Sequence, residues 1–128
     1  LKFLNYFFFI FIMISDCIFC KISSGKVQVA RICENANFFS IPDANPKTDG
    51  HSLVISKNHY ATLLDLPTSL GQELVDCIKN TSIKLMKEKN ASGFNLINNN
   101  FVSAGQVVNH VHLHIIPRKE KDGLNTLA

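Results

Sequence analysis

Histidines alternate with apolar residues near the end of the chain, in residues 109–118 (NHVHLHIIPR). Successive side chains of a strand point to opposite faces of a sheet, so a strand here would place three imidazoles on one face. They are His110, His112 and His114, out of five histidines in the chain. Two kinds of chemistry fit such a row. Alternating histidines can hold a catalytic zinc ion, or a neutral imidazole can itself be the nucleophile while its neighbours orient it or donate protons.

The loop expected before this strand, residues 98–106 (NNNFVSAGQ), helps to choose between these alternatives. Gly105 allows the backbone to approach a ligand closely, and the amide side chains of the loop can donate hydrogen bonds. Backbone N–H groups beside an imidazole suit a phosphoryl group, whose oxygens must be held while phosphorus is attacked. The loop and the histidines together indicate chemistry at phosphorus.

Four cysteines are present, and Cys17 and Cys20 form a C-x-x-C pair. Inside a cell such a pair indicates metal or redox chemistry, and no thioredoxin-like pattern surrounds it here. Cys33 falls in an expected strand and Cys77 on the apolar side of an expected helix, where small buried cysteines are common. We therefore associate the C-x-x-C pair, and not the other two cysteines, with a site.

The elements that must position these residues follow from the hydrophobic pattern. A short helix is expected at residues 17–23, and an amphipathic helix of about twenty residues begins at residues 67–69 and ends at Gly93. The expected strands are residues 29–33, 37–41, 51–56, 94–97 and 107–116. This order predicts an α+β fold, in which an antiparallel sheet carries one main amphipathic helix and a short N-terminal helix.

The composition describes one folded domain with an unusual start. The chain has 128 residues, 46% hydrophobic and 18% charged, with a net charge of +3, which argues against a disordered chain or a dedicated nucleic-acid binder. Residues 1–14 (LKFLNYFFFIFIMI) form an apolar run without a signal-peptide cleavage pattern, shorter than the ~20 residues of a transmembrane helix. We interpret Met13 as the biological start, with a weak membrane anchor as the alternative, and place the domain at residues 15–128.

The histidine segment resembles the signature of the histidine triad (HIT) superfamily, in which three histidines alternate with apolar residues. The surrounding motifs are similar to those of its Hint-like branch, the nucleoside phosphoramidases, and the resemblance extends over residues 16–118. The motifs that carry it are DCIFCKI at 16–22, DANP at 43–46, GH at 50–51, LVI at 53–55, His59, AGQ at 104–106 and HVHLHII at 110–116.

The resemblance implies a hydrolase of purine nucleoside phosphoramidates or related AMP conjugates, acting through a covalent nucleotidyl-histidine. His112 would be the nucleophile that attacks the α-phosphorus. His114 would contact the phosphoryl or leaving group, and His110 and His51 would support the row. No cofactor is implied for catalysis.

The same resemblance implies a nucleotide site. Phe19, Ile22 and the Ala44 backbone would line the purine slot, and Asp43 would accept hydrogen bonds from the ribose hydroxyls. Asn99 would lie at the ribose–phosphate end. The phosphate would be held by Gln106 and by the backbone of Gly105 to Val107.

The family likeness further implies a structural zinc ion and a homodimer. The zinc ligands would be Cys17, Cys20, His59 and His110, a tetrahedral N/S set. The expected partners are a purine nucleotide and a second copy of the chain, without nucleic acid, and without a membrane unless residues 1–14 supply an anchor. The expected location is the cytoplasm.

Three alternatives to this function stay open. They are a dinucleoside polyphosphate hydrolase, a zinc-stabilised nucleotide-binding or interaction module with little turnover, and a zinc hydrolase using the three histidines as ligands. The sequence also departs from the family pattern. Val107 stands where relatives often have Ser or Thr, which removes a hydroxyl near the leaving group, and Phe101 stands where glycine is common.

Overall fold

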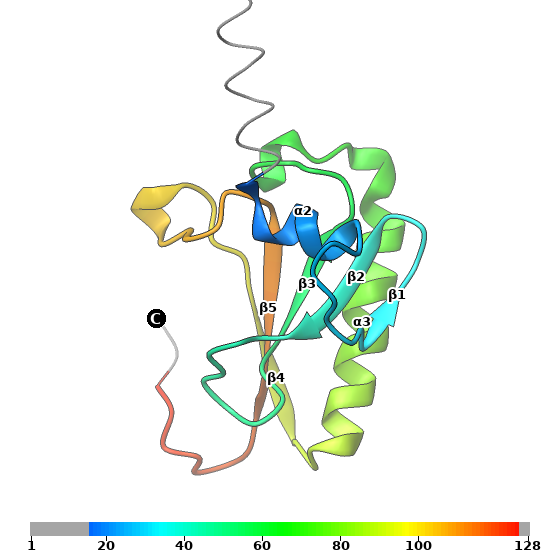
Figure 1. Cartoon of the computed structure of the whole chain (residues 1–128). Coiled ribbons are helices and arrows are strands. Elements are labelled where there is room, and N and C mark those ends of the chain that lie inside the picture. Colours follow the sequence, from blue (N-terminus) through cyan, green and yellow to red (C-terminus); the bar gives the residue numbers. More distant parts are fainter. Residues whose placement is uncertain (1–15, 126–128) are drawn as a thin grey trace, which may run out of the picture.

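Five short strands assemble into one antiparallel sheet in the computed structural model, which describes residues 16–125 (Figure 1). The sheet order is β1-β2-β3-β5-β4. The strands are β1 (Cys33–Glu34), β2 (Phe38–Pro42), β3 (Ser52–Ser56), β4 (Gly93–Ile97) and β5 (His112–Arg118). The helices are α2 (Ile18–Ser23), α3 (Gly71–Glu88) and the 3-10 turns Leu63–Asp65, Thr68–Leu70 and Val102–Ala104. The predicted α+β fold is confirmed.

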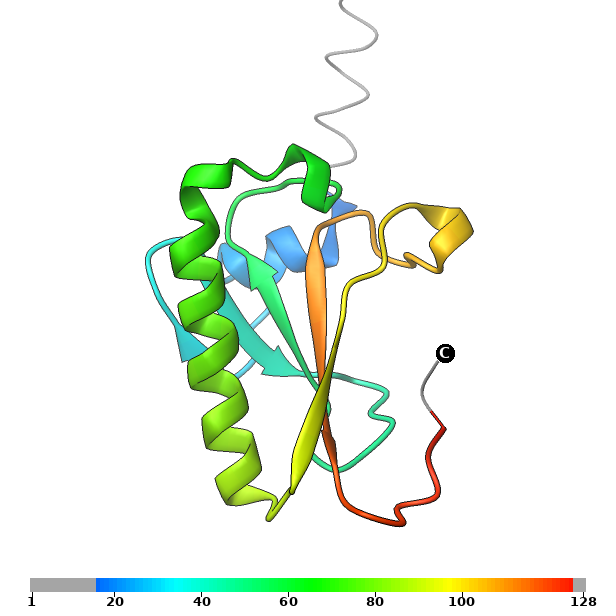
Figure 2. The ribbon, with the colours of Figure 1, turned by 180° about the vertical axis from the view of Figure 1, so that it is seen from behind.

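The two α-helices cover opposite faces of the sheet, as the two views in Figures 1 and 2 show. Alternation along β3 separates the two cores, because Leu53 and Ile55 pack with α2 while Val54 packs with α3. In the register of β3 against β5, Leu53 lies opposite His114 and Ile55 opposite His112. Both histidines therefore lie on the α2 face, where the short helix leaves room for a site.

The long helix α3 has the apolar face that the sequence predicts. Cys77 and Leu85 are buried against Phe38, Val54 and Ile115 of the sheet. Such burial stabilises the fold by roughly 1.5–3 kcal/mol for each large apolar side chain. Thr81, also on this face, forms a buried 2.8 Å hydrogen bond with the Ser40 hydroxyl, which satisfies both polar groups inside the core.

Two of the strand predictions are wrong. The strand expected at 29–33 is reduced to the two residues of β1, because the Arg31 guanidinium donates to the carbonyls of Ile22 and Ser23 and holds this segment against the end of α2. The last strand begins at His112 and not at residue 107. It also continues through Pro117, which pairs only with β4, so the missing proline N–H breaks no bond to β3.

Within residues 16–125, no helix is both long and apolar enough to cross a membrane. The predictions made for residues 1–14 concern a segment that lies outside the described residues.

Candidate active site and metal centre

His112 presents an unprotonated ring nitrogen to a cavity on the α2 face. Its Nδ1 lies 2.7 Å from the carbonyl oxygen of His110. A carbonyl only accepts hydrogen bonds, so Nδ1 carries the proton of the neutral imidazole and Nε2 keeps its lone pair. The edge of the Phe19 ring packs against the imidazole, with ring centroids 5.1 Å apart. His112 is thus a buried imidazole of fixed tautomer with Nε2 available for attack on an electrophile.

His114 presents the opposite group, an N–H donor. The backbone N–H of Lys47 donates to Nδ1 of His51 at 3.0 Å, so neutral His51 carries its proton on Nε2. That Nε2 lies 3.0 Å from Nδ1 of His114, which must then accept. The proton of neutral His114 is consequently on Nε2. Since the His112 and His114 rings are 5.2 Å apart, a lone pair and an N–H donor stand side by side.

The surroundings of His114 and His51 favour the neutral forms of these two imidazoles. Burial is the main cause that lowers the pKa of His114 to about 4, and the charges of His112 and His51 lower it further. Burial likewise lowers the pKa of His51. Asp43 opposes both shifts, because its Oδ2 lies 3.3 Å from Nε2 of His51 and 3.7 Å from Nδ1 of His114. Near pH 7 both imidazoles are neutral in the free protein, as the tautomers require.

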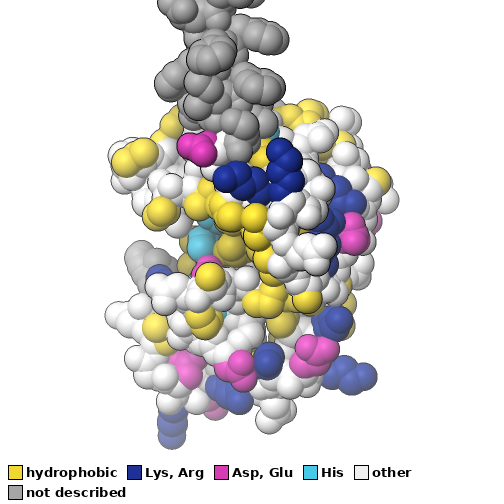
Figure 3. All heavy atoms as spheres, in the orientation of Figure 1, with side chains coloured by type: hydrophobic (Ala, Val, Ile, Leu, Met, Phe, Trp, Pro, Cys, Tyr) yellow, Lys and Arg dark blue, Asp and Glu magenta, His cyan; other side chains and the backbone are white. Residues whose placement is uncertain are grey.

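The cavity in front of the histidines has a volume of about 690 Å³, within the ~300–1,000 Å³ common for small-molecule sites. Figure 3 shows a histidine side chain in a hollow bordered by hydrophobic side chains. Five of the predicted nucleotide contacts line this cavity together with His51, His112 and His114. They are Phe19, Ile22, Asp43, Ala44 and Val107. An apolar slot that ends in imidazoles can hold a flat base with its phosphate at the polar end.

The other predicted contacts lie in the loop after β4 and do not line this cavity. A Cβ added to Gly105, whose φ is +91°, would lie 4.0 Å from the side-chain nitrogen of Asn99, so these two residues are neighbours. The Gln106 side chain accepts from the Phe101 N–H at 2.7 Å and donates to the carbonyls of Ala61 and Val108. Gln106 therefore braces the loop, and its contact with a phosphate stays a prediction.

A second cluster joins the start of α2 to the segment before β5. Its members are Cys17, Cys20, His59 and His110, whose candidate ligand atoms all lie within 4.8 Å of one another. Nδ1 of His110 lies 3.3 Å from Sγ of Cys17, and Nδ1 of His59 lies 3.3 Å from Sγ of Cys20. Ligand atoms around one tetrahedral zinc ion are about 3.3–3.8 Å apart, given bonds of about 2.0–2.3 Å. The four residues fit such an ion.

The protonation of this cluster also suits a cation. Nε2 of His110 lies 2.8 Å from the carbonyl oxygen of Ser56, so it carries the proton and leaves the lone pair of Nδ1 toward the thiols. Burial lowers the pKa of His110 to about 4 and, followed by the neighbouring Cys17, raises that of Cys20 to about 12. The Cys20 thiol is therefore neutral on its own, and a bound cation would supply the charge that ionises it.

Two other metal arrangements do not fit. Asp43, His51 and His114 also bring candidate ligand atoms within 4.8 Å. The proton on Nε2 of His51, however, occupies the atom that would face the ion. The three alternating histidines do not converge on one point either, because Nδ1 of His110 faces the thiols while Nδ1 of His112 faces a carbonyl. The geometry thus argues against a zinc hydrolase built from the alternating row.

Two partners of these histidines were not singled out by the sequence. The carbonyl of Ser56 fixes His110, and the backbone N–H of Lys47 fixes His51. Both are backbone contacts, so neither residue type carries a signal. The spacing of four residues between Lys47 and His51 inside a turn-rich loop was the one local clue.

Comparison with known proteins agrees with this geometry. The family model described as HIT domain matches residues 24–121. An adenylylsulfatase of Arabidopsis thaliana is 42% identical over 110 residues, which cover 86% of this chain and 56% of the relative. An adenosine 5'-monophosphoramidase of Candida albicans is 35% identical over 111 residues, 84% of this chain and 73% of that protein. The crystal structure of a zinc-bound histidine triad family protein from Mycobacterium smegmatis has a TM-score of 0.81 at 35% identity, covering 88% of this chain and 81% of that one.

Proposed function

The chain belongs to the HIT domain family, and from this premise we propose that it hydrolyses purine nucleoside phosphoramidates and related AMP conjugates through an adenylyl-histidine intermediate. The observation that carries the proposal is the pairing in one cavity of two imidazoles whose hydrogen-bond partners fix opposite ring nitrogens. Nε2 of His112 is a free lone pair, and Nε2 of the adjacent His114 is an N–H donor. Displacement of an amine from phosphorus uses a nucleophile together with a proton donor to the leaving group.

The first step forms the bond between Nε2 of His112 and the α-phosphorus, while the bond from phosphorus to the leaving amine breaks. Substrate binding adds one proton to the His51–His114 pair, so the departing nitrogen takes the Nε2 proton of a His114 imidazolium and leaves a neutral imidazole. The negative α-phosphoryl group and the Asp43 carboxylate, 3.7 Å from Nδ1 of His114, favour a proton on the His51–His114 pair in the complex. The His110 carbonyl stabilises the positive charge that develops on His112.

The second step returns the site to its starting state. Water attacks phosphorus and gives a proton to Nε2 of His114, and the bond between phosphorus and His112 breaks to release AMP. An imidazole is a competent leaving group from phosphorus because it departs in its stable neutral form. No metal ion takes part in this proposed step, and catalysis without a cofactor stays a prediction.

The cavity supports the proposed nucleotide contacts. Phe19 and Ile22 of α2 and the backbone of Ala44 would enclose the purine, while Asp43 would meet the ribose. Asn99, Gly105, Gln106 and Val107 would complete the phosphate end. The Asp43 carboxylate already contacts His51, so binding of the ribose and the protonation of His114 would be coupled.

We propose that the Cys17, Cys20, His59 and His110 cluster holds a structural zinc ion. The zinc-bound histidine triad family protein of Mycobacterium smegmatis, which is 35% identical to this chain, supports this assignment. The ion would tie α2, and with it the purine slot, to the segment that carries His110. The zinc content of protein purified without chelator tests this proposal. Zinc at no more than a substoichiometric trace would refute it.

A homodimer is the proposed assembly. β4 is an edge strand of the sheet, and its Phe94 and Leu96 side chains are 40% and 46% exposed. Val75 and Ile83 on the outer side of α3 are exposed as well. An exposed apolar edge is a ready surface for pairing with a second copy. A location in the cytoplasm stays a prediction, supported by the four free cysteines.

The function is tested by mixing the protein with adenosine 5'-phosphoramidate, quenching the reaction rapidly and measuring the intact mass of the protein. The wild-type protein should gain one adenylyl group transiently and release ammonia. His112→Ala should show no adduct. His114→Gln keeps the nucleophile, so it should still form the adduct, but with slower formation, slower hydrolysis or both. Turnover by His112→Ala at the wild-type rate would refute covalent catalysis. Nucleotide binding without any adduct or ammonia would favour the binding-module alternative.

A further inference from the structure

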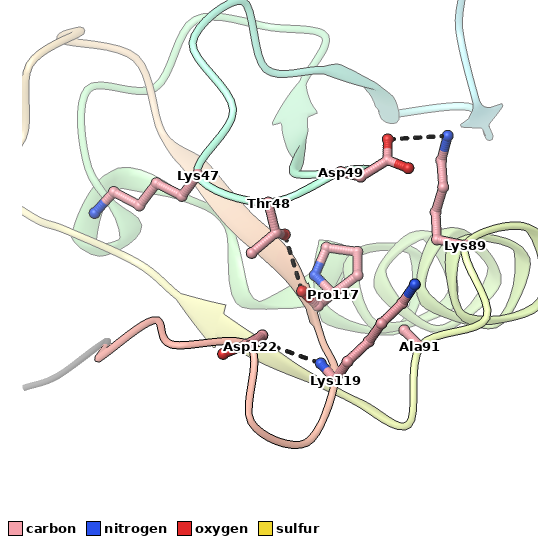
Figure 4. A pocket seen from close by; sticks show the side chains of 8 residues that line it. All are labelled: Lys47, Thr48, Asp49, Lys89, Ala91, Pro117, Lys119 and Asp122. Carbon is pink, nitrogen blue, oxygen red and sulfur yellow. Dashed lines mark hydrogen bonds and ion pairs between the residues drawn. The ribbon is translucent and has the colours of Figure 1, made fainter.

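Lys47 stands between two cavities in the loop that joins β2 to β3. It lines the cavity of the histidines and also a neighbouring cavity of about 270 Å³. Figure 4 shows the neighbouring cavity, where Lys89 faces Asp49 in an ion pair at 3.3 Å. The Lys47 ammonium points away from this pair (Figure 4). Lys47 is thus a cation at the rim of the site that holds the proposed reaction.

Within the described part of the chain, the Lys47 ammonium has no ion-pair partner of its own. Its backbone N–H is used by His51. Among residues 16–125, no carboxylate forms an ion pair with the side chain, although Lys57, Lys89 and Arg31 all have such partners. An exposed lysine without a partner is common on protein surfaces. This lysine differs because it lines the proposed catalytic cavity.

The charge of Lys47 reaches the reacting groups. The pKa of His114 is lowered by burial first and then by its histidine neighbours, and Lys47 adds to this effect. The same holds for His51, where burial dominates and Lys47 contributes. A cation that disfavours a second positive charge at His114 favours a negative charge at the same place.

We propose that Lys47 is a specificity-determining residue, which selects AMP conjugates whose leaving group is itself an anion, such as adenylyl sulfate. In an in-line displacement the leaving atom lies on the side of phosphorus opposite His112, within reach of His114. Lys47 lines the same cavity, and its backbone N–H donates to His51, which in turn contacts His114. The inference rests on the proposed function and names a substrate class for the same site.

The two leaving groups need different help from the protein. With adenylyl sulfate, the bond from Nε2 of His112 to phosphorus forms and the bond from phosphorus to the bridging oxygen breaks. Sulfate then departs as a stable dianion, so no proton has to be donated to it. An amine must be protonated as it leaves. Lys47 should therefore matter for the sulfate substrate, whereas the donor on His114 should matter more for the amine.

Three variants test the inference through the ratio of kcat/KM for adenylyl sulfate to kcat/KM for adenosine 5'-phosphoramidate. Lys47→Gln should lower this ratio about fivefold, the upper range for an exposed ion pair. Lys47→Arg should restore most of it, because the charge is kept. Lys119→Gln is the matched control, since Lys119 lines only the neighbouring cavity, and its ratio should equal that of the wild type. Raising the salt concentration should shrink the effect of Lys47→Gln.

An unchanged ratio in Lys47→Gln would overturn the inference, and so would an equal change in Lys119→Gln. Binding separates this failure from a failure of the proposed function. In a His112→Ala background, calorimetry compares the Kd values of the same two nucleotides with and without Lys47→Gln. A selective loss for adenylyl sulfate supports the role of Lys47 even if turnover is never seen, while equal losses or none refute it. A wild-type protein that hydrolyses neither nucleotide refutes the proposed function alone.

Discussion

Acidification should destabilise the protein through His114, by an amount that follows from its surroundings. The ordinary pKa of histidine is 6.5, and burial together with the neighbouring His112 and His51 lowers that of His114 to about 4. The difference of about 2.5 corresponds to about 3 kcal/mol at 1.36 kcal/mol for each pH unit. Because 22% of the side chain is exposed, we expect the measured effect to be about 2 kcal/mol.

The sign of the effect is fixed by proton binding. Between pH 6.5 and pH 4 the unfolded chain holds a proton on His114 and the folded protein does not, so the unfolded state binds more protons. The contribution of this residue to the free energy of unfolding is fully present above pH 6.5. It is lost progressively as the pH falls toward 4.

Urea unfolding of the wild type and of His114→Gln, at several pH values between 7.5 and 4.5, measures the contribution of His114 to the free energy of unfolding. The zinc concentration is kept the same in all samples. The glutamine cannot titrate in this range, and His110 and His51 titrate in both proteins. The difference between the two pH slopes therefore isolates His114 to first order. Parallel slopes, or an NMR titration that places the pKa of His114 at 6.5, would refute the assigned tautomers and the neutral state.

Three other perturbations have defined outcomes. Removing metal from the zinc-loaded protein with a chelator should lower Tm by about 10 °C or more, a loss of about 2 kcal/mol, and Cys20→Ser should do the same, as calorimetry would show. Phe101 has a φ of +72°, which glycine adopts without strain. The free energy of unfolding of Phe101→Gly should therefore exceed that of Phe101→Ala by about 1 kcal/mol, and its Tm should be higher. Leu96→Asp should shift the assembly to monomers in light scattering without lowering the Tm of the monomer.

The long helix and the central strands could be predicted because the spacing of their apolar residues along the sequence indicates which side chains are buried. The spacing of Cys77, Thr81 and Leu85 identifies the buried side of α3 without any knowledge of the sheet. The segment at 29–33 has the composition of a strand as well. The segment does not form a full strand because Arg31 donates to two carbonyls of α2. The local sequence pattern does not indicate a contact of this kind.

The candidate site was predictable in residue type but not in protonation. Alternation makes His110 and His112 equivalent in the sequence, yet only His112 lies in β5. Which ring nitrogen of His110 carries the proton depends on the Ser56 carbonyl, 54 residues away along the chain. The tautomer of His110, and with it the chemical role of the ring, therefore cannot be predicted from the neighbouring residues in the sequence.

His110 connects the proposed zinc site to the proposed nucleophile, His112, through its ring and its backbone carbonyl. Nδ1 of its ring faces the thiols of the metal cluster, and its backbone carbonyl accepts the proton on Nδ1 of His112 at 2.7 Å. A metal ion bound at the cluster would hold His110 in place and so hold the acceptor that keeps Nε2 of His112 unprotonated. Under the proposed function, the three histidines of the alternating segment would have three different tasks, which are to bind metal, to attack phosphorus and to donate a proton. The hydrogen-bond partner of one ring nitrogen would set each task, because the residue type and the spacing are the same for all three.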